Sequence, residues 1–573
     1  MADGVFVDSV SRFRSFCRTT PDAPVCTWIG DDGKEVETLT FSSLARDAGS
    51  IAGALRGRGL SPGDRVLILM QPGLDFVRAF CGCLLGRLIP VPAYPHSAAE
   101  MGRLRGIATN AGTRAVLSDA ILLRAMRAGA AEPGRSEWRD CYDTAELAAE
   151  HATPPAWEAP NPGDLAFLQY TSGSTSEPKG VRITHGNLIH QLECNRQELG
   201  LGPDARALLW VPQYHDLGLI SGLVSALIGN GRLYQMSPLT FMRKPSLWLE
   251  LVSRLRATHI AAPNFAYGLV LRKTTPEEMS KLSLESLRLV MSAAEPINPR
   301  LMHAFFNTFA RAGLRPDAFC GAYGLAEHTV GISVGGRSML WLDEEAFSGR
   351  AVSLVDENKG VAISSCGRPS RDVHVRIVDP ETLLTLPEDR VGEIWVDSPS
   401  KADGYYNNSE LSMTAFHARS ADRSDTREYL RTGDLGFLHA GELFVTGRLK
   451  DLMIFRGRNV YPTDVEQTVE AAHPSVTPRG SVVFAVPGEA GEDALVVVAE
   501  VGEVTAASDS EEIVAAIGKA VMHGHRQPCA AVVLVKPGTI PRTSSGKLRR
   551  RDTRQAFLNG SIAGSSASFG AAR

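Results

Sequence analysis

A run of hydroxyl and glycine residues is the strongest chemical signal in the sequence. The run, 171–176, follows the apolar segment 165–170, which predicts a buried strand, and it leads into Pro178-Lys179-Gly180. Hydroxyls and backbone N–H groups in such a loop can surround phosphate oxygens, and a lysine adds positive charge. A surface turn uses the same residue types, but it does not explain an unbroken run after an apolar strand. We therefore predict a phosphate-binding loop with donors at Thr171, Ser172, Gly173, Ser174, Thr175 and Lys179.

This loop differs from a Walker A motif. No Gly-Lys-Ser/Thr stands at the required spacing after its first glycine. Gly546-Lys547 fails the same test, because Pro541 stands where the first glycine is needed. The sequence therefore indicates a phosphate site that is not of the Walker A kind.

Five further segments follow the loop, and in this order all six resemble the motifs of the adenylate-forming superfamily. That superfamily comprises acyl-CoA synthetases, nonribosomal adenylation domains and luciferases. Each segment alone is a weak pattern, but six in the correct order are specific, and the chain is identified as a member. The segments are Ser-Ala-Ala-Glu-Pro at 292–296, Gly-Ala-Tyr-Gly-Leu-Ala-Glu at 321–327, Tyr-Leu-Arg-Thr-Gly-Asp at 429–434, Gly-Arg-Leu-Lys-Asp at 447–451 and Pro-Arg-Thr-Ser-Ser-Gly-Lys at 541–547.

The resemblance implies a role for each segment. Tyr323 would stack on adenine, and Asp434 would bond the ribose hydroxyls. Lys450 would be the hinge between two domains, and Lys547 would be the catalytic lysine. Glu327 and Thr175 would hold Mg²⁺, since a carboxylate suits a hard cation that bridges phosphate oxygens. The nucleotide-binding residues implied outside the phosphate loop are Ala294, Glu295, Pro296, Tyr323, Asp434 and Arg448.

Other segments narrow the resemblance to fatty acyl-AMP ligases. Tyr-His-Asp at 214–216, followed by Gly-Leu-Ile at 218–220, is typical of that group. The segments 236–241, 263–267 and 457–462 are similar to it as well. Residues 331–365 occupy the place where that group carries an insertion absent from acyl-CoA synthetases, with a variable surface loop as the alternative. His328 departs from the pattern of that group, in which a small residue usually follows the glutamate that corresponds to Glu327. The departure lies next to the expected adenine contacts.

The implied reaction is attack of a fatty acid carboxylate on the α-phosphate of ATP, with release of pyrophosphate. Both reactants are anions, so positioning and charge neutralisation must supply most of the catalysis. Lys547 would act there as a fixed cation. His215 is the second catalytic candidate, at the position of an aromatic or histidine gate, with a structural histidine as an equal alternative. The expected acyl pocket contains Gly218, Ile220, Gly222 and Phe265. Packing in the hydrophobic core is the alternative explanation for this apolar segment.

The second step implied by the resemblance is transfer to the phosphopantetheine thiol of an acyl carrier protein, after the small domain rotates about the hinge. Two alternatives remain open. One is a fatty acyl-CoA synthetase, which differs in the acceptor, and the other is a catalytically silent nucleotide- or lipid-binding module. Retention of Lys547, Glu327 and Asp434 argues against the silent module. The expected ligands are ATP, Mg²⁺, a fatty acid and a carrier protein.

Apolar runs alternate with amphipathic stretches, which predicts an α/β fold with partly parallel sheets. We expect a helix at 74–85 and another at 465–472. Strands are expected at 65–70, 165–170, 258–262, 287–292 and 394–396, and a compact second sheet at 481–486, 494–499 and 530–535.

The expected domain organisation combines these elements with the resemblance. An N-terminal adenylation domain would span 1–449, and a small mobile α+β domain with the catalytic lysine would span 450–560. Residues 133–162 read as an insertion or linker. Residues 561–573 are mostly small and polar, so we expect a disordered tail.

Composition excludes several other classes of protein. A chain of 573 residues is too long for a single hydrophobic core, so it predicts two or more domains. A composition of 44% hydrophobic and 22% charged residues is typical of globular proteins. The net charge of -4 gives no basic footprint for nucleic acid or a membrane surface. A signal segment and a membrane-length apolar run are both missing. Nine scattered cysteines favour buried thiols over a metal site, so we expect a cytoplasmic protein without stable membrane insertion.

Overall fold

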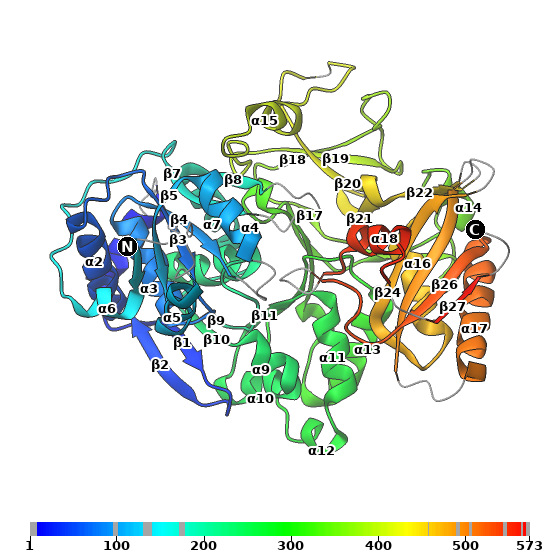
Figure 1. The fold of residues 1–573 in the computed structure, drawn as a ribbon, viewed down its shortest axis with the longest axis horizontal. Helices are drawn as coiled ribbons and strands as arrows, with labels where there is room; N and C mark the ends of the chain where they lie inside the picture. Colours follow the sequence, from blue (N-terminus) through cyan, green and yellow to red (C-terminus); the bar gives the residue numbers. More distant parts are fainter. Residues whose placement is uncertain are drawn as a thin grey trace.

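A computed structural model describes residues 8–94, 101–129, 140–170, 178–423, 425–455, 458–488, 493–502, 507–542, 547–562 and 565–568. The chain forms a large domain of packed sheets and helices and a smaller domain at its C-terminal end (Figure 1). In that view the small domain, in orange and red, lies beside the green helices α11 (Asn264–Lys273) and α13 (Pro299–Phe309). Among the described helices, none combines the length and the apolar character that a membrane crossing requires.

The largest sheet of the described part has nine strands, and its central strands are parallel. Parallel strands are covered on both faces, so they read as short apolar runs, which explains why the strand expected at 258–262 is found. The order is β17 (Arg368–Pro369), β14 (Ser333–Gly336), β13 (Phe319–Tyr323), β12 (Leu289–Ser292), β11 (His259–Ala262), β9 (Arg206–Leu209), β10 (Arg232–Met236), β1 (Pro24–Ile29) and β2 (Glu35–Thr40).

A second, fully parallel sheet lies nearer the N-terminus, in the order β4 (Ile89–Ala93), β3 (Arg65–Leu69), β5 (Thr113–Ser118) and β6 (Cys141–Asp143). The predicted helix at 74–85 is α3 (Leu74–Leu85). The hairpin of β7 (Leu165–Tyr170) and β8 (Gly180–Thr184) frames the predicted phosphate loop. One hydrophobic cluster joins these elements, since Ile68, Phe167 and Ile260 all belong to it.

The remaining helices of the large domain lie around these sheets and at the upper and lower edges of the view in Figure 1. Their bounds are α1 (Ser9–Thr19), α2 (Phe41–Gly57), α4 (Met101–Ala111), α5 (Ala120–Gly129), α6 (Thr144–Ala149), α7 (His185–Glu198), α8 (Ser225–Gly229), α9 (Pro238–Arg243), α10 (Ser246–Leu255), α12 (Pro276–Met279) and α15 (Ser409–Phe416). The segment expected as a linker at 133–162 contains β6 and α6, while residues 130–139 lie outside the described part.

A four-stranded antiparallel sheet leads to the small domain. Its order is β18 (His374–Val378), β19 (Gly392–Asp397), β20 (Leu430–His439) and β21 (Glu442–Arg448). The predicted insertion, 331–365, contributes β14 to the large sheet and adds β15 (Met339–Leu342), α14 (Glu344–Ser348) and β16 (Val361–Ser364). Phe347 of α14 stacks on Tyr461 at 5.0 Å between ring centroids, so the insertion packs against the start of the small domain.

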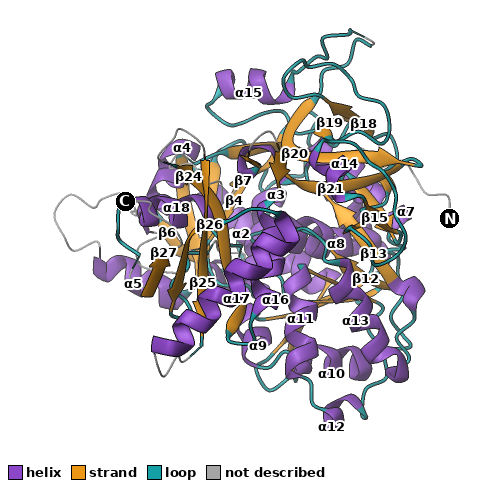
Figure 2. Ribbon diagram, turned by 90° about the vertical axis from the view of Figure 1, so that its right-hand side faces the viewer, coloured by secondary structure: helices purple, strands orange, loops and turns teal. Residues whose placement is uncertain are grey.

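The small domain is built on the sheet β24 (Val476–Pro487), β25 (Asp493–Val501), β26 (Cys529–Val535) and β27 (Ser565–Ser568). Helices α16 (Pro462–Ala472) and α17 (Ala507–His525) lie on one face of it, and α18 (Arg550–Leu558) lies on the other (Figure 2). The short hairpin β22 (Met453–Phe455) and β23 (Arg458–Val460) precedes them. The predicted helix and the three predicted strands of this region are confirmed.

The expectation of a disordered tail over 561–573 is wrong for four of its residues. Ser565–Ser568 forms β27, which pairs antiparallel with β26. Strand β26 would otherwise be an edge strand, and its free N–H and C=O groups accept any extended segment that reaches them. Small polar residues satisfy such pairing through the backbone alone, so their composition did not indicate it. Residues 569–573 lie outside the described part.

Candidate functional site

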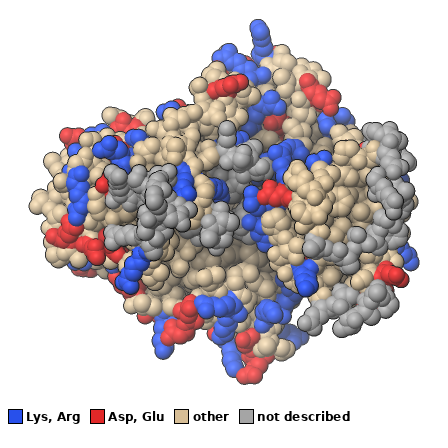
Figure 3. All heavy atoms as spheres, in the orientation of Figure 1, with Lys and Arg blue, Asp and Glu red and all other residues tan. Residues whose placement is uncertain are grey.

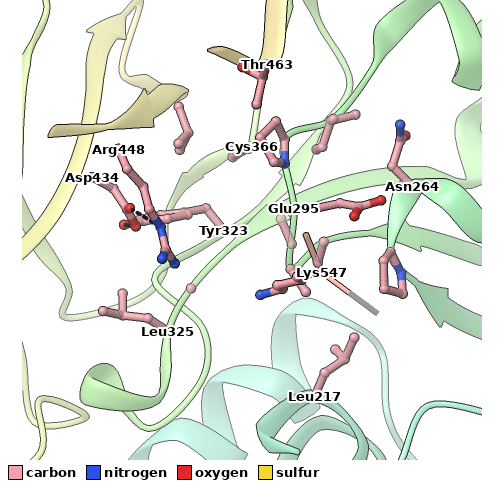
Figure 4. A pocket seen from close by; sticks show the side chains of 18 of the residues that line it. Leu217, Asn264, Glu295, Tyr323, Leu325, Cys366, Asp434, Arg448, Thr463 and Lys547 are labelled. Carbon is pink, nitrogen blue, oxygen red and sulfur yellow. Dashed lines mark hydrogen bonds and ion pairs between the residues drawn. The ribbon is translucent and has the colours of Figure 1, made fainter. Parts of the chain in front are cut away.

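A cavity of about 1020 Å³ lies between the large domain and the small domain. Its walls come from both domains, since Tyr323, Asp434 and Lys547 all line it. In the space-filling view, lysine and arginine side chains border the hollow between the two bodies (Figure 3). The close-up shows Lys547, Arg448, Asp434, Tyr323 and Glu295 around one open space (Figure 4). Residues that are far apart in the sequence therefore meet in a single cleft.

One corner of the cavity is a tyrosine, a carboxylate and a guanidinium from three strands. The hydroxyl of Tyr323, at the end of β13, donates to Asp434 Oδ2 at 2.7 Å. Asp434 and Arg448 are direct partners in the β20–β21 register, and Arg448 Nε lies 3.3 Å from Asp434 Oδ1. Burial raises the pKa of Asp434, while Arg448 and the tyrosine hydrogen bond oppose that rise. An aromatic face beside a carboxylate can bind a base and the hydroxyls of its sugar.

A second carboxylate, Glu327, lies in the short 3₁₀ segment Ala326–His328 that follows β13. The hydroxyl of Tyr405 donates to Glu327 Oε1 at 2.9 Å. The ammonium of Lys179 lies 5.7 Å from the centre of the same tyrosine ring. Burial raises the pKa of Glu327, and the tyrosine hydrogen bond lowers it. Lys179 and Glu327 are thus held close to one another around Tyr405.

Lys547 reaches into the cavity from the segment between β26 and α18, and its side chain points into the open space (Figure 4). Burial lowers the pKa of Lys547, and the carboxylate of Asp216 is the strongest opposing influence. Asp216 itself is desolvated, which raises its pKa, while Lys547 lowers it. Its carboxylate also accepts from the backbone N–H of Leu217 at 2.7 Å. Lys547 and Asp216 both line the cleft, and each charge influences the pKa of the other.

The hinge candidate Lys450 lines the same cavity, in the 3₁₀ segment Leu449–Asp451 directly after β21. Burial lowers its pKa, and Arg448 lowers it further by repulsion. The position between the β18–β21 sheet and the first hairpin of the small domain is where a hinge would lie.

The loop after β12 carries the candidates Ala294, Glu295 and Pro296, which all line the cavity. Ala294 has a φ of 69°, a backbone conformation that is uncommon for a residue with a side chain. Glu295 Oε1 accepts from the backbone N–H of Phe265 at 2.8 Å. Its Oε2 is 2.8 Å from Arg479 Nη2 of the small domain. This loop is thus the point at which the two domains meet beside the cavity.

The apolar arm of the cavity is lined by Trp210, Leu217 and Phe265, together with His215 and Ser221. The wall element is a π-helix, Leu217–Val224, a rare conformation that is frequent at functional sites. His215 precedes it, with its ring centre 5.0 Å from that of Tyr214. An apolar lining of this kind suits an aliphatic chain.

Three of the four acyl-pocket candidates, Gly218, Ile220 and Gly222, lie behind this wall instead of on its surface, whereas Phe265 lines the cavity. A Cβ on Gly218 would be 2.2 Å from the carbonyl oxygen of Pro212, and one on Gly222 would be 2.6 Å from Leu209. Both glycines therefore allow close packing of the π-helix on the segment before it. Leu217 and Ser221, four residues apart, are the residues that this element presents to the cavity.

The phosphate-loop candidates Thr171, Ser172, Gly173, Ser174 and Thr175 lie outside the described residues. Lys179, at the end of the loop, lines the cavity. The departure at His328 is a buried structural residue. Its ring nitrogens lie 2.8 Å from the carbonyl oxygen of Gly331 and 2.6 Å from Ser398 Oγ, and burial lowers its pKa to about 4. A neutral ring that donates to Gly331 and accepts from Ser398 satisfies both contacts.

Sequence reasoning missed three residues of this site: Tyr405, Asp216 as a charge that acts on Lys547, and Arg479. Tyr405 stands in Asp-Gly-Tyr-Tyr at 403–406, a pattern without a distinctive chemical signal. Asp216 is the last residue of the Tyr-His-Asp motif at 214–216, which does not indicate an influence on Lys547. Arg479 lies in the small domain, and no local pattern indicates a partner 184 residues away.

The chain thus has a large and a small domain, and the cleft between them is lined by residues that the sequence predicts to bind a nucleotide. Residues 13–406 match the family described as AMP-binding enzyme, and residues 450–566 match the AMP domain described as Disco-interacting protein 2-like. Because the first match covers more than half of the chain, the protein belongs to the AMP-binding enzyme family.

Known relatives share most of the chain's length. It is 40% identical to the medium-chain fatty acid–acyl-carrier-protein ligase JamA of Moorena producens, over 94% of this chain and 92% of the relative. The fatty acyl-adenylate ligase of Legionella pneumophila, solved with acyl adenylate and pyrophosphate, is 32% identical with a TM-score of 0.75 over 98% of both chains. A structure from a study of fatty acyl-adenylate ligases of E. coli and L. pneumophila is 26% identical with a TM-score of 0.87, over 97% of this chain and 98% of the other.

Proposed function

We propose that this enzyme activates a fatty acid with ATP to form acyl-AMP and pyrophosphate, and then transfers the acyl group to the phosphopantetheine thiol of an acyl carrier protein. The observation that carries the proposal is the cleft itself. The Tyr323–Asp434 corner, which suits a base and its ribose, Lys547 and an apolar arm open into one cavity. The likeness to a carrier-protein ligase over nearly the whole chain supports the choice of acceptor.

In the first step, a carboxylate oxygen attacks the α-phosphorus, a new P–O bond forms, and the bond to the β-phosphate oxygen breaks. The electron pair leaves with pyrophosphate, and no proton is transferred. Lys547, in the cleft beside Asp216, neutralises charge between the two anions. Tyr323 and Asp434 hold the adenosine part, and Lys179 with the loop at 171–175 binds phosphate oxygens. The apolar arm orients the acid so that its carboxylate faces the α-phosphate.

The donor set fits a magnesium ion that arrives with the nucleotide. Among the residues that the structure describes, no group of three His, Cys, Asp or Glu side chains could hold a metal by itself. Mg²⁺ bound to a nucleotide needs only one or two protein carboxylates, because phosphates and water supply the rest. Glu327 is such a carboxylate, desolvated and with an elevated pKa, and Thr175 is the proposed second ligand. The ion would neutralise charge on the phosphate oxygens.

In the second step, the thiol sulfur attacks the acyl carbonyl carbon, a thioester forms, and the bond from that carbon to the phosphate oxygen breaks. AMP leaves, and the thiol proton passes to water. His215 lines the cavity beside the apolar arm, where the carbonyl would lie, and we assign it a gating role there. We further propose that the small domain, 450–560, moves about Lys450 between the two steps.

The experiment is a panel of fatty acids incubated with the full chain, ATP and Mg²⁺, with pyrophosphate release and acyl-AMP mass as readouts. A phosphopantetheinylated carrier protein and free CoA are offered in parallel, and thioester is measured by mass. We expect acyl-AMP with both acceptors but thioester only with the carrier protein. Failure of every acid to release pyrophosphate would refute the adenylation step. Rapid formation of acyl-CoA would refute the choice of carrier protein.

A further inference from the structure

Arg479 of the small domain joins the large domain at the rim of the nucleotide site. Its Nη2 lies 2.8 Å from Glu295 Oε2, and the two side chains are only 26% and 13% exposed. The guanidinium also stacks 4.3 Å from the ring centre of Phe265. Phe265 in turn donates its backbone N–H to the other oxygen of Glu295. One arginine therefore contacts both an acyl-arm residue and the loop of a proposed nucleotide site.

The backbone on each side of this ion pair is in an unfavourable conformation. Arg479 has a φ of 54° and Ala294, next to Glu295, has a φ of 69°. Non-glycine residues held in this region are strained, and such residues cluster at functional sites. Backbone strain therefore accompanies the Arg479–Glu295 contact on both sides of the domain interface.

The small domain holds Arg479 in place from its own core. Arg542 Nη2 donates to the carbonyl oxygen of Arg479 at 2.7 Å and lies 3.2 Å from the buried carboxylate of Glu500. The carboxylate of Glu470 accepts a hydrogen bond from the backbone of Arg479. These contacts belong to the same domain that carries Lys547. The position of the guanidinium on Glu295 is thus rigidly linked to the body that delivers the catalytic lysine.

We propose that Arg479 is a positioning residue for adenylation, which clamps the loop 292–296 through Glu295 and holds the small domain in the arrangement that places Lys547 in the cleft. This inference rests on the proposed function. The clamp acts on the loop and on the domain together, so its loss affects the step that needs Lys547 beside the α-phosphate. Thiol attack on preformed acyl-AMP has no α-phosphate to be attacked and does not need this arrangement.

The kinetic test compares R479Q, E295Q, the double variant and R526Q. Arg526 is a matched control, because it is an exposed arginine of the same domain with a φ of 53°. Isotope exchange between ATP and pyrophosphate reports adenylation, and transfer from supplied acyl-AMP to the carrier reports the second step. We expect R479Q to lower kcat/KM for exchange by roughly 10- to 100-fold, as truncation of one partner in a desolvated pair does. The double variant should lose no more than the worse single variant, because both remove one interaction.

Transfer from supplied acyl-AMP should remain within about threefold of wild type in R479Q, and R526Q should match wild type in both assays. R479K keeps the charge and should recover part of the exchange activity, which a purely structural defect would not allow. Equal exchange in R479Q and wild type, additive losses in the double variant, or equal losses in both steps would each overturn the proposal.

A second measurement does not depend on activity. Hydrogen exchange of the free protein, followed by mass spectrometry, reports the backbone N–H of Phe265 and the loop 292–296. We expect faster exchange there in R479Q and no change in R526Q. Unchanged protection in R479Q overturns the clamp even if the enzyme is active. If wild type adenylates no fatty acid while R479Q loses protection, the proposed function fails and the clamp stands.

Discussion

Replacement of Tyr323 by phenylalanine tests the proposed nucleotide corner most directly. The substitution removes one hydroxyl and keeps the aromatic face. The hydroxyl donates to Asp434 at 2.7 Å, and hydrogen bonds to charged groups contribute about 1.5 to 3 kcal/mol. Since 1.4 kcal/mol corresponds to a factor of ten, we expect KM for ATP to rise by at most about 10- to 100-fold, the limit reached when the whole contribution is lost from ATP binding. The value of kcat should change less, because Lys547 and the apolar arm are untouched.

The pH dependence gives the same substitution a second readout. The tyrosine hydrogen bond favours the charged form of Asp434 and lowers its pKa against the effect of burial. Loss of the bond therefore raises the pKa of Asp434 further. If the corner binds ATP only with Asp434 ionised, the acid limb of kcat/KM for ATP should move to higher pH in Y323F.

Tyr429 provides a matched control for this test. Its hydroxyl donates to the carboxylate of Asp425 at the same distance, 2.7 Å, but Tyr429 does not line the cavity. Y429F should therefore lower the melting temperature without changing KM for ATP. A Y323F enzyme whose KM for ATP stays within twofold of wild type, with an unmoved acid limb, would refute the assignment of this corner.

Three further predictions concern the other walls of the cleft. K547A should lower the rate of pyrophosphate exchange by about 10²- to 10³-fold. Because burial lowers the pKa of Lys547, the wild-type enzyme should lose activity at alkaline pH, whereas the residual rate of K547A should not change with pH there. E327Q keeps an acceptor for Tyr405 but loses the charge, so a titration of exchange rate against Mg²⁺ should show a higher half-saturating concentration, and an unchanged midpoint would contradict the role of Glu327. G218A should destabilise the large domain by roughly 1 to 3 kcal/mol or more in urea unfolding, because its Cβ meets backbone at 2.2 Å, whereas G163A, with open space around it, should not.

The parts of the fold that sequence predicted are those set by local periodicity. Helix α3 spans the predicted residues, and β11, β12 and β24 to β26 each overlap an apolar run that predicts a strand. Such runs report burial on two faces, which is a local property. Strand β27 could not be found in this way, because four small polar residues pair through their backbone with an edge strand.

Several residues of the site could be predicted from local motifs, whereas the contacts between them could not. Tyr323, Asp434 and Lys547 were named from motifs, and the structure brings all three to one cavity. The register that sets Asp434 opposite Arg448 and the contact between Arg479 and Glu295 depend on strand pairing and domain packing. Gly218 and Gly222 show the limit of residue type as a guide, because small residues on an apolar helix can face either a ligand or a packed neighbour.

The charged side chains that line the cleft are poorly hydrated in the free protein, so a ligand of opposite charge can stabilise them. Burial raises the pKa of Asp216, Glu327 and Asp434, and it lowers the pKa of Lys450 and Lys547. Acids and bases are therefore both desolvated in the free protein, and each charged form is less stable there than in water. A triphosphate with its cation, and a carboxylate at the end of an apolar chain, would supply opposite charges to both sets. Dipoles and charges that are already oriented need no reorganisation when the α-phosphate is attacked, which is the condition under which electrostatic stabilisation is largest.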